Sequence, residues 1–230
     1  MLNRIYCLLY AVDGRQDGGD DWAQLRNHNN LNTLLALSSE LDRQLEEWYN
    51  SIPHKIRPPN GTGPVANDRG KVLRIRYYVA KHLIHRPFVL YLALQQSATL
   101  TEGSSGSASA QPPHLSSSRL VLDKCETCIA SSRAYLYNVA EMLGRRSPYL
   151  WTYSQNCLAG MLVLAIAQAC PLLYAITPDI RPLYALIIPK LQRWADQGSS
   201  FEAVVTILQR MSNRDGGAPR PAWQLSEVRP

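Results

Sequence analysis

The chain has 230 residues, of which 46% are hydrophobic and 18% are charged, and its formal net charge is +6. This length supports one large domain or two small ones. A charged share below the usual value of about 25% indicates that much of the chain is buried. Five cysteines, an odd number in a chain of this size, argue against a disulfide framework and fit a reducing compartment.

Residues 1–96 read as helices separated by breaks, the first of them a short amphipathic helix at the N-terminus. Leucines spaced by three or four predict a second helix over residues 22–49. Ser39 and Asp42 form an S-x-x-D pair, which indicates that this helix restarts there. Four prolines and two glycines between residues 51 and 64 then exclude a helix or a central strand.

The next predicted helix, residues 67–94, is the most basic part of the chain. It holds six Lys or Arg and one acid, and so carries most of the net charge of +6. Its apolar positions predict one buried face (Val72, Ile75, Val79, Leu83), and the cationic positions fall opposite (Lys71, Arg74, Lys81, His82, His85). Such a stripe is commonly a solvated face. The alternative is a docking surface for an acidic partner or a nucleic-acid backbone.

Two residues of this helix predict more specific features. Arg76 falls among the apolar positions, so we expect it to point towards the core, with a carboxylate or backbone carbonyl groups as its partner. Pro87 has no amide proton and crowds the preceding turn, so we expect the helix to end or kink there.

The second half of the chain begins with a change of composition. Residues 97–118 hold eight serines and two glycines, too little apolar area to offset the entropy of ordering, and predict a disordered loop. Helical periodicity resumes over residues 119–212, which we assign to the same domain as residues 1–96; residues 213–230 read as a flexible tail. No alternating strand pattern with hairpin turns occurs. The predicted fold is therefore all-α, an irregular helical bundle around a central apolar helix.

Residues 157–176 are the candidate for that central helix. No charged residue occurs from Ser147 to Pro178, and Gln168 is the one strongly polar residue of the segment, which is long enough to cross a bilayer. A membrane protein with a single span at 157–176 is therefore the alternative. We favour a buried core helix without membrane contact, because amphipathic helices on both sides would cover it.

Residues with catalytic or metal-binding potential occur without the partners that such chemistry needs. Cys125 and Cys128 have the spacing of a zinc pair, but no second pair exists, so they read as small core residues. His82 and His85 lack a third ligand. No catalytic or phosphate-binding motif occurs, so we expect no enzyme activity and no cofactor or metal in this chain.

Three further patterns occur in a fixed order. The first is LDRQLEEWYNSIPHKIRP at 41–58, and the second is LRIRYYVAKHLIHRPF at 73–88. The third is the small-residue helix CETCIASSRAYL at 125–136, which follows the serine-rich stretch. Together with NRIYCLLY at 3–10, they resemble the regulatory middle homology region, or fungal-specific transcription factor domain, of fungal zinc-cluster transcription factors. The resemblance spans residues 3–211.

The resemblance implies an all-helical regulatory domain of a nuclear, DNA-binding regulator of transcription by RNA polymerase II. Implied partners are the transcription machinery or co-regulators and a small-molecule effector. The family's DNA-binding module, six cysteines holding two zinc ions, does not occur in this sequence. DNA and zinc would therefore be bound only by a module missing here, and the chain is expected to be the C-terminal part of such a protein, a truncated product or a fragment.

The motif residues receive structural or regulatory roles from the same comparison, with no catalytic, cofactor or metal residue among them. They are Trp48, Pro53, Arg57, Arg76, Tyr77, Tyr78, His85, Arg86 and Pro87. We expect Arg57 and Arg86 to tie the proline-rich loop and a helix end to backbone carbonyl groups. A ligand cavity, with the polar edges of Tyr77, Tyr78 and Tyr153, is expected between the helices 67–94 and 157–176.

Overall fold

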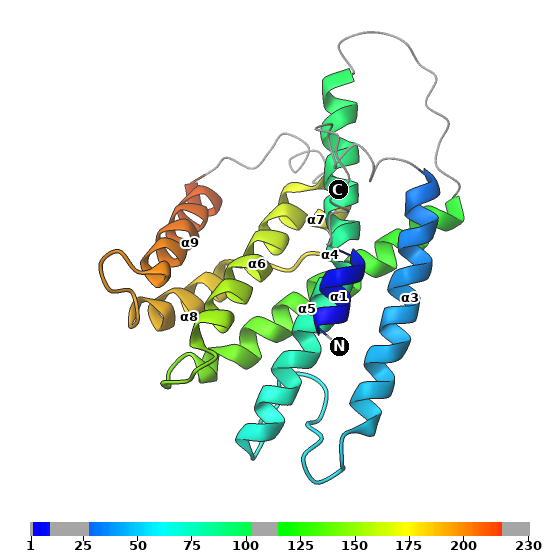
Figure 1. Cartoon of the computed structure of the whole chain (residues 1–230). Helices are drawn as coiled ribbons and strands as arrows, with labels where there is room; N and C mark the ends of the chain where they lie inside the picture. The colour runs from blue at the N-terminus through cyan, green and yellow to red at the C-terminus, as the bar shows by residue number, and fades with distance from the viewer. Residues whose placement is uncertain (1, 10–27, 103–114, 218–230) are drawn as a thin grey trace, which may run out of the picture. The chain divides into compact units, whose positions relative to one another are not determined.

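The computed structural model describes residues 2–9, 28–102 and 115–217, and the regular elements of these ranges are all α-helices (Figure 1). The all-α prediction is therefore confirmed for the described part of the chain. The helices are α1 (Leu2–Leu9), α3 (His28–Ser51), α4 (Asp68–Glu102), α5 (Leu115–Met142), α6 (Leu150–Ala169), α7 (Pro171–Tyr174), α8 (Arg181–Gln192) and α9 (Ser200–Gly217).

The chain divides into two compact units, Met1–Tyr135 and Leu136–Pro230, which we call unit 1 and unit 2. The division falls inside α5, so the first turns of this helix belong to unit 1 and its last turns to unit 2. That residues 1–96 and 119–212 form a single domain stays a prediction.

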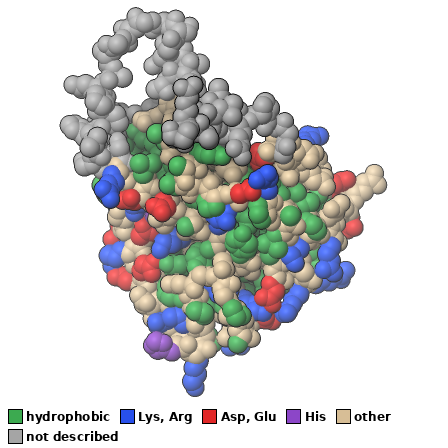
Figure 2. All heavy atoms as spheres, turned by 180° about the vertical axis from the view of Figure 1, so that it is seen from behind, with side chains coloured by type: hydrophobic (Ala, Val, Ile, Leu, Met, Phe, Trp, Pro, Cys, Tyr) green, Lys and Arg blue, Asp and Glu red, His purple; other side chains and the backbone are tan. Residues whose placement is uncertain are grey.

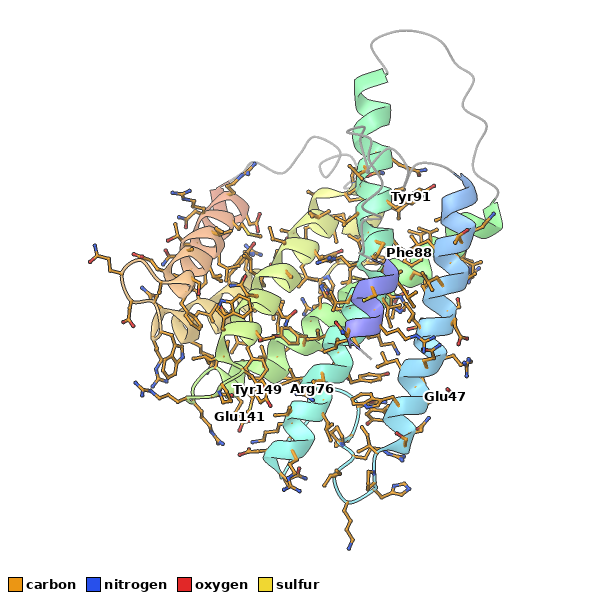
Figure 3. The ribbon with its side chains drawn as sticks, viewed as in Figure 1. Glu47, Arg76, Phe88, Tyr91, Glu141 and Tyr149 are labelled. Atoms are coloured by element: carbon orange, nitrogen blue, oxygen red, sulfur yellow. The ribbon has the colours of Figure 1, made fainter. Side chains whose placement is uncertain are left out.

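Unit 1 is built around α4, against which α1 and α3 pack. From Arg74 to Leu92, buried side chains occur on every side of α4, as they do in a helix at the centre of a core. The largest fully buried side chains of the unit come from all four of its described helices and include Ile5, Leu41, Leu45, Ile75, Leu83, Ile84, Phe88 and Ile129. Figure 3 labels Phe88 and Tyr91, both buried, on this helix.

The central position of α4 overturns the predicted cationic face. Arg74, His82 and His85 keep only 6%, 4% and 1% of their surface exposed, whereas Arg76, predicted to point inward, is exposed. The prediction failed because periodicity orients a helix only when one face is apolar, and the middle of α4 has apolar residues on all faces. On the face shown in Figure 2, Lys and Arg are scattered among acidic and apolar side chains.

Three predicted helix boundaries are also wrong. α4 continues through Pro87 and past the predicted end at residue 94 to Glu102, because burial of its middle part offsets the loss of one backbone hydrogen bond. A kink at Pro87, the alternative to an end there, stays a prediction. α3 does not restart at Ser39, whose hydroxyl donates to the Leu35 carbonyl of its own helix over 2.9 Å. Residues 97–102 and 115–118 of the predicted disordered loop are helical, and 103–114 lie outside the described residues.

Unit 2 consists of the last turns of α5 with α6, α7, α8 and α9. α9 packs against both α6 and α8, and α7 packs against α6. Tyr184 of α8 donates to Asp215 Oδ2 of α9 over 2.9 Å, and Trp194 Nε1, after α8, donates to the Leu143 carbonyl over 2.7 Å. α9 extends to Gly217, so the predicted tail begins with helix, and residues 218–230 lie outside the described part.

The apolar helix α6 is buried along one face. Its buried side chains include Tyr153, Cys157, Met161, Leu164 and Ala167. On other sides, Trp151 and Leu162 remain 59% and 40% exposed. The segment 157–176 is not one helix, because the backbone becomes extended at Cys170 and Pro171 starts α7. By length and composition, α6 is the one described helix that could cross a membrane, and half of its apolar window is buried within the protein.

Candidate functional site

The motif residues singled out by the sequence all belong to unit 1. They lie on the last turns of α3, on the proline-rich segment 52–67 that follows it, and on α4. Three local arrangements account for most of them: a stapled proline-rich segment, a tyrosine–glutamate–lysine cluster and a pair of buried histidine contacts.

Arg57 staples the proline-rich segment to the end of α3. Its Nε donates to the Ile52 carbonyl over 3.0 Å, and its Nη2 donates to the Asn50 carbonyl. α3 ends at Ser51, so both carbonyls lie where the helix itself supplies no donor. Tyr49 adds a second tie, because its hydroxyl donates to the Pro58 carbonyl. These are the carbonyl contacts that we predicted for Arg57.

Pro53 and Trp48 contribute to the same segment in simpler ways. The Pro53 carbonyl accepts from the backbone amides of Ile56 and Arg57 over 3.0 and 2.9 Å, which forms the first turn after α3, while its ring is exposed. Trp48 is half-buried on α3, and its carbonyl accepts from the Ser51 hydroxyl over 2.7 Å. Both residues shape the turn and present no reactive group.

Tyr77 is the centre of the second arrangement. Its hydroxyl donates to Glu46 Oε1 over 2.6 Å, and Lys81 Nζ donates to the same carboxylate oxygen over 2.9 Å and to the tyrosine hydroxyl over 3.0 Å. Burial, together with the hydrogen bond to Glu46, raises the pKa of Tyr77 to about 12. Tyr77 therefore stays a protonated donor at neutral pH and cannot serve as a base.

Tyrosine rings extend this cluster to the proline-rich segment. The ring centroids of Tyr49 and Tyr77 are 4.9 Å apart, and those of Tyr77 and Tyr78 are 5.3 Å apart with a steep interplanar angle of 76°. The hydroxyl of Tyr78 accepts from the backbone amide of Gly61 over 2.6 Å. Gly61 has a φ of 98°, a left-handed conformation that glycine adopts without strain. The paired tyrosines thus hold the loop against α4.

His85 belongs to a charged contact between three helices. Its Nε2 lies 3.2 Å from Asp42 Oδ1 without the alignment of a hydrogen bond, and Lys124 Nζ donates to Asp42 Oδ2 over 2.9 Å. Burial would raise the pKa of Asp42, but the nearby His85 and Lys124 outweigh it and lower the value. Burial lowers the pKa of His85 despite Asp42, so the imidazole is neutral at pH 7 and Lys124 is the cation that neutralises Asp42.

His82 forms a second buried contact, with α5. Its Nδ1 lies 2.7 Å from Ser132 Oγ, whose hydroxyl donates to the Cys128 carbonyl over 2.7 Å. Burial, with smaller effects of Arg86 and His85, lowers the pKa of His82 to about 3, and burial raises the pKa of the Cys128 thiol to about 12. Both groups are neutral at pH 7. Cys125 and Cys128 are fully buried free thiols, as expected of core residues.

The three remaining motif residues all lie on α4. Arg76 is exposed on α4, Pro87 is buried inside the same helix, and the half-buried Arg86 lies near His82 and Cys128. The structural role of Arg86 stays a prediction. So does the ligand cavity beside Tyr153, because it would join helices of two units that are described separately.

Sequence reasoning missed the acidic partners on α3. Asp42 and Glu46 are four residues apart, and so are Lys81 and His85 on α4. In the structure, Glu46 pairs with Lys81, and Asp42 lies against His85. Such a matched spacing of opposite charges on consecutive helices is the signal that could have found the contact, because i and i+4 side chains share a face. It would also have corrected the predicted orientation of α4.

The chemistry open to this site is limited by burial. Within the described residues, no group of three or more His, Cys, Asp or Glu side chains could hold a metal ion. The titratable groups are held by partners from neighbouring helices, an arrangement that fixes helix positions. The chain matches no model of a known protein family, no curated protein and no solved structure.

Proposed function

We propose that this chain is a non-catalytic regulatory domain of a fungal transcription factor, which acts in the nucleus on transcription by RNA polymerase II. It would work through contacts with the transcription machinery or co-regulators, in response to a small-molecule effector. DNA and zinc would be bound only by the zinc-cluster module, which this sequence does not contain. The sequence resemblance described above motivates this proposal.

One structural observation supports it: most of the motif residues form contacts within the protein. Tyr77 donates to Glu46, the Arg57 guanidinium holds the end of α3, and His85 is buried against Asp42. A catalytic group has to reach a substrate and carry a pKa suited to proton transfer. Groups buried and bonded in this way instead favour a scaffold whose surface carries the function.

The test is a reporter assay in a fungal cell. The full chain is fused to an unrelated DNA-binding domain, and transcription from a promoter carrying that domain's site is measured. We expect a reproducible change, in either direction, relative to the DNA-binding domain alone. The variant Ile84→Asp, which places a charge in the core of unit 1, should abolish the change, whereas Arg69→Ala, at an exposed position of α4 outside the motifs, should not. Unchanged transcription with the fusion present in the nucleus would contradict the proposal.

A membrane protein remains the second candidate, because α6 has the length and composition of a span and exposes Trp151 and Leu162. The two proposals are separated by extraction of cell membranes with alkaline carbonate. A protein released into the supernatant supports the regulatory domain, and a protein retained in the pellet supports the membrane alternative.

A further inference from the structure

Unit 2 carries a group of exposed arginines at the turn between α5 and α6. Arg145 and Arg146 occupy the turn itself, and Arg193 follows the last residue of α8. A Cβ placed on Gly144 would lie 4.0 Å from Arg193 Nη1. The Arg193 guanidinium therefore lies beside the residue that precedes Arg145 and Arg146, whose Cα atoms follow that of Gly144 in steps of about 3.8 Å. We call this group the arginine turn.

The arginine turn is held in one conformation by hydrogen bonds of unit 2. The Leu143 carbonyl accepts from Trp194 Nε1 over 2.7 Å, and the Gly144 amide donates to the Glu141 carbonyl over 3.3 Å. On the other side of the turn, the Leu150 amide donates to the Ser147 carbonyl over 3.1 Å. A binding surface that is already ordered loses less conformational entropy when a partner binds.

The positive charge of the arginine turn is only partly balanced. Arg145 lies 3.7 Å from Glu141, and the exposed Asp196 follows Arg193 by three residues. No described carboxylate forms an ion pair with Arg146 or Arg193. These two guanidinium groups are therefore available to carboxylates of another molecule, which they can bind through two parallel hydrogen bonds.

Exposed apolar side chains follow Arg145 and Arg146 in the sequence and offer a second kind of contact. Pro148 is exposed in the turn, and Trp151, 59% exposed, lies in the first turn of α6. Tyr149, which is also exposed, lies between these two residues in the sequence. Figure 3 labels Tyr149 at the start of α6 and Glu141 before the turn. Arginine and large aromatic side chains are the residues that most often dominate the energy of protein–protein contacts.

We propose that the arginine turn is a docking surface for an acidic segment of a partner protein, one in which glutamates or aspartates flank an apolar side chain. The carboxylates would pair with Arg146 and Arg193, and the apolar side chain would contact the exposed surface next to Pro148 and Trp151. This inference does not depend on a role in transcription.

Charge and extent favour an acidic peptide over a nucleic acid. The described part of unit 2, residues 136–217, holds seven Lys or Arg against five Asp or Glu, so its surface is only weakly basic overall. A protein that binds duplex DNA through its backbone typically makes about 6–10 phosphate contacts spread along a basic surface. Three arginines at and beside one turn fit a short segment of acidic side chains better.

The test measures binding of the full chain to a labelled fifteen-residue peptide with alternating glutamates and a central leucine pair, by fluorescence anisotropy. We expect saturable binding that weakens by at least tenfold when glutamine replaces each glutamate, and that weakens with added salt. The double variant Arg146→Glu with Arg193→Glu should lower the affinity by at least tenfold. The matched control, Arg210→Glu with Arg214→Glu on α9, changes the net charge equally and should keep the affinity within about twofold.

Three results would overturn the proposal. Equal losses in the test and control variants would mean that binding follows total charge and not this surface. Tighter binding of a labelled DNA duplex than of the peptide, with the same dependence on Arg146 and Arg193, would assign the surface to nucleic acid. A change in oligomeric state on gel filtration, found only in the test variant, would assign it to a second copy of the chain.

Discussion

At the scale of single residues, Ser132 determines how the deepest histidine of unit 1 is protonated. Its one hydroxyl proton is donated to the Cys128 carbonyl, so the oxygen can only accept from His82 Nδ1. We infer that Nδ1 carries the imidazole proton. His82 Nε2 is then an acceptor, and it is buried without a hydrogen-bond partner among the described residues. The ring is held by one good hydrogen bond.

Removal of that bond gives the first prediction. Ser132→Ala should lower the free energy of unfolding by about 1–3 kcal/mol, because it removes the 2.7 Å hydrogen bond of a buried ring and leaves Nδ1 with only a 3.8 Å contact to Cys128 Sγ. Thr127→Ala on the same helix is the control. The Thr127 hydroxyl donates to the Asp123 carbonyl at an exposed position, so its loss should change stability by less than about 0.5 kcal/mol. Urea denaturation followed by circular dichroism measures both, and equal effects would contradict the assignment.

The carboxylate of Asp42 gives the second prediction. Asp42→Asn keeps the shape of the side chain but removes the charge that faces Lys124 over 2.9 Å, while Lys124 itself is only 17% exposed. We expect a loss of about 1–3 kcal/mol. Glu40→Gln, two residues earlier on α3, removes a solvent-exposed pair with Arg43 and should have the smaller effect. Thermal denaturation of the two variants provides the comparison, and a larger effect at Glu40 would refute this ranking.

At the scale of elements, the start of α4 depends on a side-chain cap. Asn67 Oδ1 accepts from the backbone amide of Gly70 over 2.6 Å, which supplies an acceptor to one of the first amides of the helix. Gly70 leaves room for this arrangement, since a Cβ there would lie 2.9 Å from Val65 Cγ1 and 3.1 Å from the cap oxygen. The segment after the proline-rich turn is therefore fitted closely to the helix it starts.

Loss of this cap gives the third prediction. Asn67→Ala should destabilise the chain by about 1 kcal/mol, and Asn67→Asp should preserve stability because its carboxylate also accepts at the helix N-terminus. Hydrogen exchange localises the effect. We expect faster exchange in the first turn of α4 for the alanine variant, whereas a change confined to other helices would show that the cap does not hold this end.

Element types were predictable from this sequence, and element orientation was not. Apolar spacing and the absence of strand patterns identify helices, because these signals are local. The prediction that α4 could end at Pro87 failed, because the continuation of the helix through Pro87 depends on tertiary burial, which a local rule cannot contain. The prediction of which face of α4 is buried failed for a related reason. Judged from the sequence alone, His82 and His85 are polar residues suited to the surface. They can be buried because Ser132 on α5 faces His82 and Asp42 on α3 faces His85.

The candidate site shows the same division. The role of Arg57 was accessible from sequence, because an arginine next to proline after a helix has nearby carbonyl groups to satisfy. Arg76 was placed in the core and is exposed, whereas Arg74 two residues earlier is buried. The three tyrosines were visible as a group only after folding, because Tyr49 belongs to α3 and Tyr77 and Tyr78 to α4.

At the scale of the whole molecule, the two units differ in their titratable groups. All five histidines occur between residues 28 and 114, so the part of the chain in unit 2 has none. Burial lowers the pKa values of His82 and His85 in unit 1; Lys81, Arg86 and Lys124 near them act in the same direction, and Asp42 opposes it at His85 without outweighing burial. Protonation of either ring in the folded state would place a further cation in this region. The stability of unit 1 should therefore depend on pH between neutrality and pH 5, and that of unit 2 should not.

The sign of this fourth prediction follows from proton linkage. In the unfolded chain His82 has its ordinary pKa of 6.5, and in the folded chain its pKa is about 3. Below pH 6.5 the unfolded chain therefore binds a proton that the folded chain excludes, and stability falls until the pH reaches the folded value. At pH 5.5, one unit below the ordinary value, His82 alone costs about 1.4 kcal/mol. The depressed pKa of His85 acts in the same direction.

Hydrogen exchange at pH 7.5 and pH 5.5, corrected for the intrinsic pH dependence of amide exchange, measures this effect unit by unit. Amides of α4 should lose about tenfold in protection at the lower pH, because 1.4 kcal/mol corresponds to a factor of ten in an opening equilibrium. Amides of α8 and α9 should keep theirs. In His82→Gln the difference between the two pH values should shrink in α4, whatever the variant's overall stability. Equal losses of protection in both units would contradict this prediction and would mean that the two units unfold cooperatively. The helix α5, which contributes turns to both units, would then couple them.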